Sequence, residues 1–60
     1  MKYYLIDDEI GIVKTLENLI ESRNLGEVIG YATDPVDAAE EIIELKPDIV
    51  LADLLMSRMD

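Results

Sequence analysis

Histidine and cysteine are both absent from this 60-residue chain. Without cysteine the chain forms no disulfide bond and no thiolate zinc site, and without histidine it holds neither a Ser-His-Asp nor a Cys-His catalytic arrangement. The three glycines, Gly11, Gly26 and Gly30, are scattered, which excludes a glycine-rich phosphate-binding loop. Any chemistry in these residues therefore has to come from other side chains.

Basic residues and long apolar runs are also scarce. Fourteen acidic residues against five basic ones give a formal net charge of −9. This charge repels nucleic acid and anionic membranes, so we expect no direct binding of this segment to either. No apolar run is long enough for a secretory signal or a membrane span. We therefore expect a soluble, cytoplasmic protein.

The chain is shorter than an ordinary domain. A domain of this size buries only about 60% of the surface that its unfolded chain exposes, so its stability is marginal. Disulfide bonds and metal sites built on cysteine or histidine are excluded by composition. Association with another chain remains as a source of stability, and we expect a homo-oligomer.

Five alternating elements are predicted from apolar runs and from turn and cap residues. They are a strand at Lys2–Ile6, a helix at about 9–23, a strand at Glu27–Ala32, a helix with its N-cap at Asp34 and Pro35 in its first position, and a strand at 48–52. The second helix ends before Lys46-Pro47, because the residue before a proline is disfavoured in helical conformation.

Apolar residues at helical spacing predict the buried face of each helix. In the first helix they are Ile12, Val13, Leu16, Leu19 and Ile20, and in the second they are Val36, Ala39, Ile42, Ile43 and Leu45. Asn24 and Gly26 follow the first helix, and both tolerate the left-handed conformation that often ends a helix.

The βαβαβ order with short connections predicts a parallel α/β sheet. Right-handed crossovers then place the first strand in the centre, in the order 2-1-3, with the two helices on opposite faces. One helix on each face leaves the sheet partly uncovered, and the third strand has an unpaired edge. We therefore expect Leu5, Val50 and Leu51 to be only partly covered.

Acidic residues follow two strands that this layout makes neighbours. Asp7 and Asp8 come directly after the first strand, and Asp53 follows the third. Ligands of open α/β sheets bind where the carboxyl ends of strands meet. Crowded carboxylates repel one another, so a divalent cation is the natural compensation, and the pattern predicts a Mg²⁺ site with one carboxylate left for chemistry. Two alternatives stay open: Asp7-Asp8 as the acidic first turn of a helix, and Asp53 as a turn residue.

The sequence excludes two other types of functional site that are built on acidic residues. A calcium-binding EF-hand loop would put Ile6 and Ile10 at positions where oxygen ligands are required. A phosphatase of the haloacid dehalogenase type needs a second aspartate two residues after the first, and Leu55 stands two residues after Asp53.

A family resemblance combines these features. The matching residues are Asp7-Asp8, the lead-in Lys46-Pro47-Asp48, Asp53 after the apolar strand, and the segment Leu54-Leu55-Met56-Ser57-Arg58-Met59-Asp60. The chain resembles the first half of a receiver domain from a two-component response regulator. It departs from the family pattern at Ser57, where a proline is usual.

The resemblance implies half of a flavodoxin-like receiver fold and a role for each matched residue. Asp53 corresponds to the aspartate that accepts a phosphoryl group from a sensor histidine kinase. Asp8 corresponds to a direct Mg²⁺ ligand, and Asp7 to one that acts through a metal-bound water. Asp53 and the main-chain carbonyl of Leu55 complete the protein ligands of the metal.

The resemblance also sets expectations about the whole protein. Residues 1–60 are expected to form a partial receiver domain, truncated after the phosphoacceptor loop, with no second domain. Phosphoryl transfer is expected to be impaired, because the family's lysine and hydroxyl residues lie beyond position 60. The chain is expected to be a signalling module and not an enzyme, and a full-length relative would carry an output domain that often binds DNA. The alternative is a non-signalling unit that a second copy completes.

Overall fold

The computed structural model describes residues 1–53. Its elements are β1 (Lys2–Ile6), α1 (Ile10–Ser22), β2 (Glu27–Ala32), α2 (Pro35–Leu45) and β3 (Ile49–Ala52). The predicted βαβαβ order is confirmed, and α1 is one residue shorter at each end than predicted. Within these residues, neither helix is long and apolar enough to cross a membrane.

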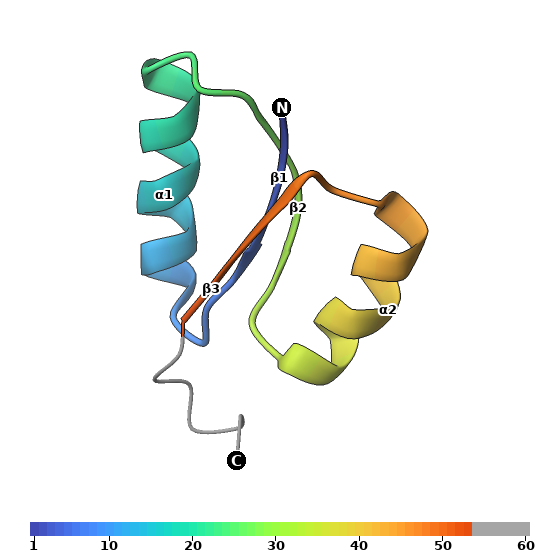
Figure 1. Ribbon diagram of the computed structural model, residues 1–60. Coiled ribbons are helices and arrows are strands. Elements are labelled where there is room, and N and C mark those ends of the chain that lie inside the picture. Colours follow the sequence, from blue (N-terminus) through green and yellow to red (C-terminus); the bar gives the residue numbers. More distant parts are fainter. Residues whose placement is uncertain (54–60) are drawn as a thin grey trace.

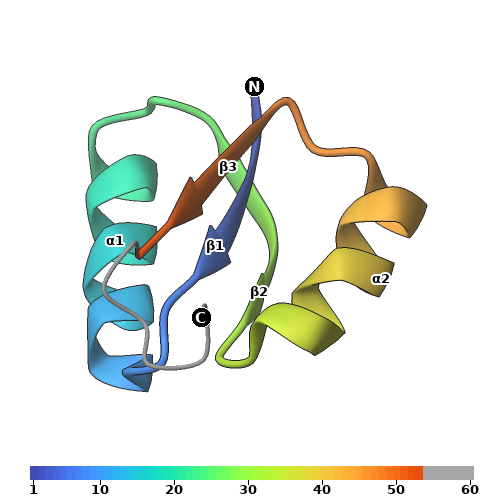
Figure 2. The same ribbon diagram turned by 60° about the horizontal axis from the view of Figure 1, so that its bottom comes forward.

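The three strands form one parallel sheet in the order β2-β1-β3, as predicted (Figure 1). In the register of β1 with β3, Tyr3 lies beside Ile49 and Ile6 beside Ala52. Figure 2 shows the three strands running in one direction between the two helices. This arrangement is half of a flavodoxin-like α/β fold.

Asp48 lies just outside β3, although the sequence placed it in the strand. Its main-chain N–H donates to the carbonyl oxygen of Lys2 at 2.9 Å, and its carboxylate accepts the N–H of Lys2 at 2.8 Å. Asp48 therefore fastens the start of β3 to the start of β1 through both its main chain and its side chain.

Each face of the sheet carries one helix (Figure 1) and one small core. Beneath α2, the buried residues are Tyr4, Ala32 and Ala38, with Ile6 and Ile42 packed against them. Beneath α1, they are Leu5, Val13 and Ile20, with Tyr3, Leu16 and Val28 packed against them. Alternate residues of the central strand thus serve opposite cores, as the period of a strand requires.

The expected coverage of the sheet is right for β3 and wrong for β1. Val50 and Leu51 are 40% and 37% exposed, whereas Leu5 is fully buried. The difference arises because β1 is the central strand: α1 covers Leu5, and β2 and β3 shield it on both sides.

The predicted buried face of α2 is also partly wrong. Val36 and Ile43 are each 76% exposed, while Ala38, which was not predicted, is buried. Ala38 and Ile42 are four residues apart and share one face of the helix, which packs on Tyr4. The small side chain of Ala38 allows this close packing. Compared with the predicted orientation, α2 is rotated about its axis so that Ala38 and Ile42 face the sheet, and Val36 and Ile43 point away from it.

The helix ends show how the sequence shapes the connections. The carboxylate of Asp34 accepts the N–H of Val36 at 2.8 Å and caps α2, as predicted. Asn24 follows α1 in left-handed conformation, with a φ of 55°. Lys46 adopts the same conformation after α2, with a φ of 53°. Gly26 does not, and the prediction for it is wrong.

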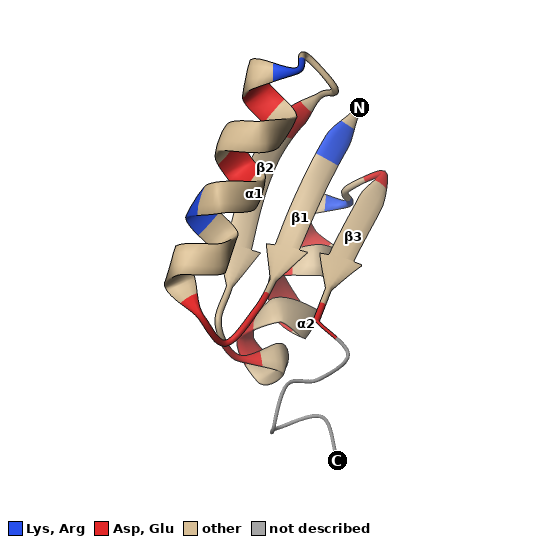
Figure 3. Cartoon of the chain, turned by 90° about the vertical axis from the view of Figure 1, so that its left-hand side faces the viewer, with Lys and Arg blue, Asp and Glu red and all other residues tan. Residues whose placement is uncertain are grey.

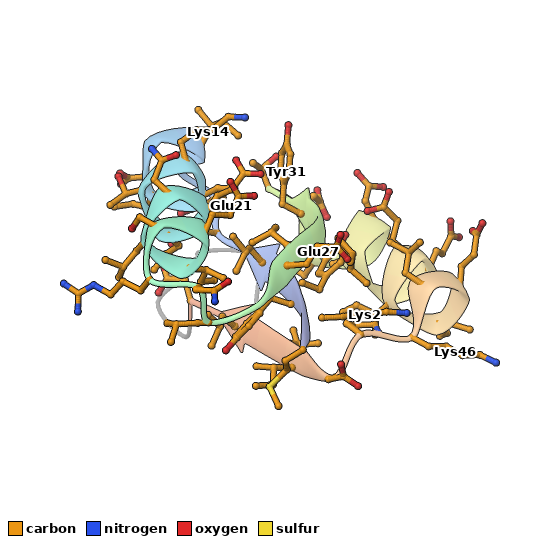
Figure 4. All side chains as sticks on the ribbon, turned by 90° about the horizontal axis from the view of Figure 1, so that it is seen from above. Lys2, Lys14, Glu21, Glu27, Tyr31 and Lys46 are labelled. Carbon is orange, nitrogen blue, oxygen red and sulfur yellow. The ribbon has the colours of Figure 1, made fainter. Side chains whose placement is uncertain are left out.

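A contact between side chains links α1 to β2. The Nζ of Lys14 lies 5.5 Å from the centre of the Tyr31 ring (Figure 4). The same Nζ lies 3.8 Å from the carboxylate of Glu17. Both contacts are on the surface, so they contribute little to stability.

Candidate functional site

The carboxyl ends of β1 and β3 meet at one edge of the sheet. Beyond β1, the N–H of Asp7 donates to the carbonyl oxygen of Ala32 at 3.2 Å. Beyond β3, the N–H of Asp53 donates to the carbonyl oxygen of Ile6 at 3.0 Å. The hydrogen-bond ladders therefore continue one step past the strands, and this step places Asp7 and Asp53 side by side.

Three carboxylates converge at this edge. One oxygen from each of Asp7, Asp8 and Asp53 can be chosen so that all three lie within 4.8 Å of one another. Figure 3 shows the acidic segments that follow β1 and β3 at the same end of the sheet. The structure therefore brings together the three aspartates that the sequence predicted to meet.

The three aspartates differ in their exposure to water. Asp7 is only 7% exposed, Asp53 is half-buried and Asp8 is exposed. One oxygen of Asp7 accepts the main-chain N–H of Glu9 at 2.9 Å, which fixes this carboxylate and shapes the start of α1. The site thus has a fixed, buried member and a member that is open to solvent.

The donor set suits Mg²⁺, which prefers oxygen ligands in octahedral geometry at 2.0–2.1 Å. Two oxygens in one such shell lie at most about 4.2 Å apart, twice the metal–oxygen distance. The three carboxylate oxygens lie within 4.8 Å of one another, which is close to this limit. The donor set therefore suits a cation that binds oxygen ligands and keeps part of its water.

A hollow of about 430 Å³ opens beside the aspartates. It lies between the start of α1 and the end of β3, and its walls are Ile6, Asp7, Glu9, Ile12, Leu16, Leu51, Ala52 and Asp53. Glu9 lines this hollow although its place in the sequence was not predicted to belong to the site. Its position directly after the acidic pair was the signal that could have indicated it.

The remaining predicted ligand, the main-chain carbonyl of Leu55, lies outside the described residues. The same holds for Ser57 and the rest of the segment that carries the family pattern. The roles of Asp7, Asp8 and Asp53 as metal ligands, and of Asp53 as phosphoacceptor, stay predictions.

Comparison with known proteins places the chain in a family. Over all 60 residues it is 43% identical to protein-glutamate methylesterase/protein-glutamine glutaminase 3 of Geobacter sulfurreducens. A protein of the same type from Bdellovibrio bacteriovorus is 38% identical over 60 residues, and one from Xanthomonas oryzae is 44% identical over 57 residues, or 93% of this chain. The N-terminal region of these proteins is a receiver domain, and the match covers its first half.

The chain belongs to the receiver-domain family. It spans 16% to 17% of the length of the curated relatives that it matches. No family model matches it, and neither does any solved structure. The receiver fold explains why the aspartates follow β1 and β3, whose ends are adjacent in its parallel sheet.

The comparisons correct one expectation. The sequence predicted a signalling module that is not an enzyme, yet the relatives are named as methylesterases and glutaminases, which are enzymes. The prediction rested on residues that match only a sixth of such a protein. The absence of histidine and cysteine from this segment carries no information about the chemistry of the other five sixths.

Proposed function

We propose that this chain is the phosphoryl-accepting part of a receiver domain in a protein-glutamate methylesterase/protein-glutamine glutaminase. A sensor histidine kinase is the proposed donor, and the transfer depends on Mg²⁺. The observation that carries the proposal is the convergence of carboxylate oxygens from Asp7, Asp8 and Asp53 within 4.8 Å. The methylesterase assignment rests on the names of the relatives.

Each aspartate has a distinct role in this proposal. Asp53 is the nucleophile, because it is half-buried at the end of β3 and lines the hollow. Asp8 is exposed and binds the metal directly. Asp7 is held by the N–H of Glu9 and acts through a metal-bound water. The carbonyl of Leu55 is the further proposed ligand.

The transfer step is an in-line displacement at phosphorus. A carboxylate oxygen of Asp53 forms the new P–O bond while the P–N bond of the phosphohistidine breaks. The bonding electron pair leaves with the imidazole, which then takes a proton. Bound Mg²⁺ would neutralise charge on the phosphoryl oxygens, and the protein's main contribution is to position the reacting groups. The product is an acyl phosphate on Asp53.

The wider proposals concern the cell and the assembly. We propose a cytoplasmic location, since the acidic chain carries no apolar run of membrane length. Association of two copies stays a prediction. The partial exposure of Val50 and Leu51 favours it, because β3 is hydrogen-bonded to β1 alone among residues 1–53.

Incubation of the purified protein with acetyl phosphate and Mg²⁺, followed by intact-mass measurement, tests the proposal. We expect only part of the protein to gain the mass of one phosphoryl group, because the family's lysine and hydroxyl residues lie beyond position 60, and we expect this gain to be lost when EDTA replaces Mg²⁺. Asp53→Asn should abolish the increase, because an amide oxygen is a far weaker nucleophile than a carboxylate.

Asp48→Asn is the matched control, because it makes the same substitution at the opposite end of β3. This variant should still gain a phosphoryl group. Equal labelling of the parent protein and Asp53→Asn would show that Asp53 is not the acceptor.

A further inference from the structure

Glu9 is a fourth carboxylate at the rim of the site, and the proposed function gives it no role. It lines the hollow together with Asp7 and Asp53. It is not a member of the group whose oxygens gather within 4.8 Å, which among residues 1–53 consists of Asp7, Asp8 and Asp53. Glu9 is therefore beside the candidate metal site without being a direct ligand.

The side chain of Glu9 makes no hydrogen bond and no ion pair among the described residues. Glu9 is the N-cap residue of α1, yet its carboxylate makes no capping hydrogen bond. Within residues 1–53 it forms no ion pair or other side-chain hydrogen bond. The contacts that fix its position are made by its main chain: the N–H donates to Asp7 at 2.9 Å, and the carbonyl oxygen accepts the N–H groups of Ile12 at 3.0 Å and Val13 at 3.3 Å.

We propose that Glu9 is a positioning residue for the cation, acting on it through water. Its carboxylate accepts hydrogen bonds from water molecules that the bound Mg²⁺ retains, and its charge attracts the cation into the hollow. This inference rests on the proposed function, because it assumes the metal site formed by Asp7, Asp8 and Asp53.

Two physical facts support this role. Mg²⁺ loses its water reluctantly and usually keeps several molecules of it, so its binding sites need acceptors beyond the direct ligands. An exposed carboxylate also acts on a nearby cation through space, and salt weakens this effect because the Debye length shortens from about 30 Å at 0.01 M to about 3 Å at 1 M. A role of this kind therefore depends on ionic strength, whereas a purely structural role does not.

Titration of the purified protein with MgCl₂ by isothermal titration calorimetry tests the inference. At low ionic strength we expect Glu9→Gln to weaken Mg²⁺ binding on the order of threefold to tenfold, and at about 0.5 M NaCl we expect the difference to fall below about twofold. Glu9→Asp keeps the charge and should retain most of the affinity. The Glu9→Gln change leaves the main-chain bond to Asp7 in place, so we expect the variant to keep the fold.

Glu21→Gln is the matched control. It removes the same charge from the same helix, about 18 Å along the axis from Glu9, and should leave Mg²⁺ affinity unchanged at 0.15 M salt, where the Debye length is about 8 Å. Equal affinities of the parent and Glu9→Gln at low salt would overturn the inference. So would an equal loss of affinity at low and high salt, which indicates a direct ligand.

The Asp8→Asn variant separates this inference from the proposed function. If it binds Mg²⁺ as tightly as the parent, or if the parent binds none, the site of the proposed function is wrong. If Asp8→Asn binds weakly while Glu9→Gln binds like the parent, the site is right and only the role of Glu9 is overturned.

Discussion

At the scale of single residues, Tyr4 makes a contact that its position in the sequence does not indicate. Its ring is fully buried beneath α2, and its hydroxyl donates a hydrogen bond of 2.5 Å to a carboxylate oxygen of Glu41. Burial raises the pKa of the Tyr4 hydroxyl well above its usual value of 10.0, and the hydrogen bond to Glu41 and the charges of Glu41 and Asp37 raise it further. The sequence indicated a sheet residue, but it did not indicate this link between β1 and α2.

The raised pKa of Tyr4 predicts a loss of stability at high pH. Above about pH 10 the unfolded chain releases the tyrosine proton while the folded chain keeps it, so the free energy of unfolding falls by about 1.4 kcal/mol per pH unit from this group. Urea unfolding from about pH 8 to about pH 11 measures the slope. Tyr4→Phe should lack this decrease of the unfolding free energy at high pH. At pH 8 the variant should be less stable than the parent by about 1–2 kcal/mol, because the hydrogen bond to Glu41 is lost.

Tyr31→Phe is the control for this experiment, because Tyr31 is 43% exposed. At pH 8 its free energy of unfolding should change less than that of Tyr4→Phe, whose hydroxyl is hydrogen-bonded to Glu41 in the parent. A Tyr4→Phe variant with the full parental slope would show that Tyr4 does not cause the loss.

At the scale of the elements, two glycines occupy opposite environments. An ideal Cβ on Gly26, just before β2, would lie 2.3 Å from the main-chain oxygen of Met1 and 2.6 Å from the ring of Tyr3. The same oxygen accepts the N–H of Glu27 at 2.8 Å, so β2 has to start against the first residue of the chain. Gly11, in the first turn of α1, would have nothing within 4 Å of an added Cβ.

Alanine substitutions at these glycines should therefore change stability in opposite directions. Gly26→Ala should lower the free energy of unfolding by about 1–3 kcal/mol, because main-chain atoms would have to move. Gly11→Ala should raise it by about 0.5–1 kcal/mol, because alanine favours the helix and meets no obstacle. Chemical denaturation of both variants measures the two changes, and a change of the same sign in both would contradict this reasoning.

At the scale of the whole molecule, charge and size limit stability together. The net charge of −9 makes the compact state repel itself, and three of the acidic groups are crowded at the end of the sheet. Screening by salt reduces the general repulsion. A cation bound by the three aspartates would in addition stabilise the folded state by mass action.

Mg²⁺ should accordingly raise the thermal midpoint more than NaCl does at equal ionic strength. At a Mg²⁺ concentration of one hundred times the dissociation constant, specific Mg²⁺ binding should raise the free energy of unfolding by about 2.7 kcal/mol, and this increase is the specific part of the effect. Asp8→Asn should lose most of this specific part, whereas Glu44→Gln, which removes an exposed charge from α2, should keep it. Equal effects of the two salts on the parent protein would argue against a specific metal site.

Local patterns in the sequence were enough to determine the elements, the strand order and the three aspartates at the edge of the sheet. Strand and helix periods, cap residues such as Asp34 and the right-handed crossover rule act over a few residues or through chirality alone. Packing decided the rest. The rotation of α2 that buries Ala38 in place of Val36 depends on the ring of Tyr4, more than thirty residues earlier in the chain.

The tertiary structure alone decided three other features: the full burial of Leu5, the close approach that requires Gly26, and the place of Glu9 in the hollow. Each depends on contacts between segments that are distant in sequence, or on the shape of a space between elements. Periodicity describes which face of an element is apolar, but only the packed arrangement determines what lies against that face. For this reason the sequence could indicate where the aspartates meet, while the structure was needed to show what surrounds them.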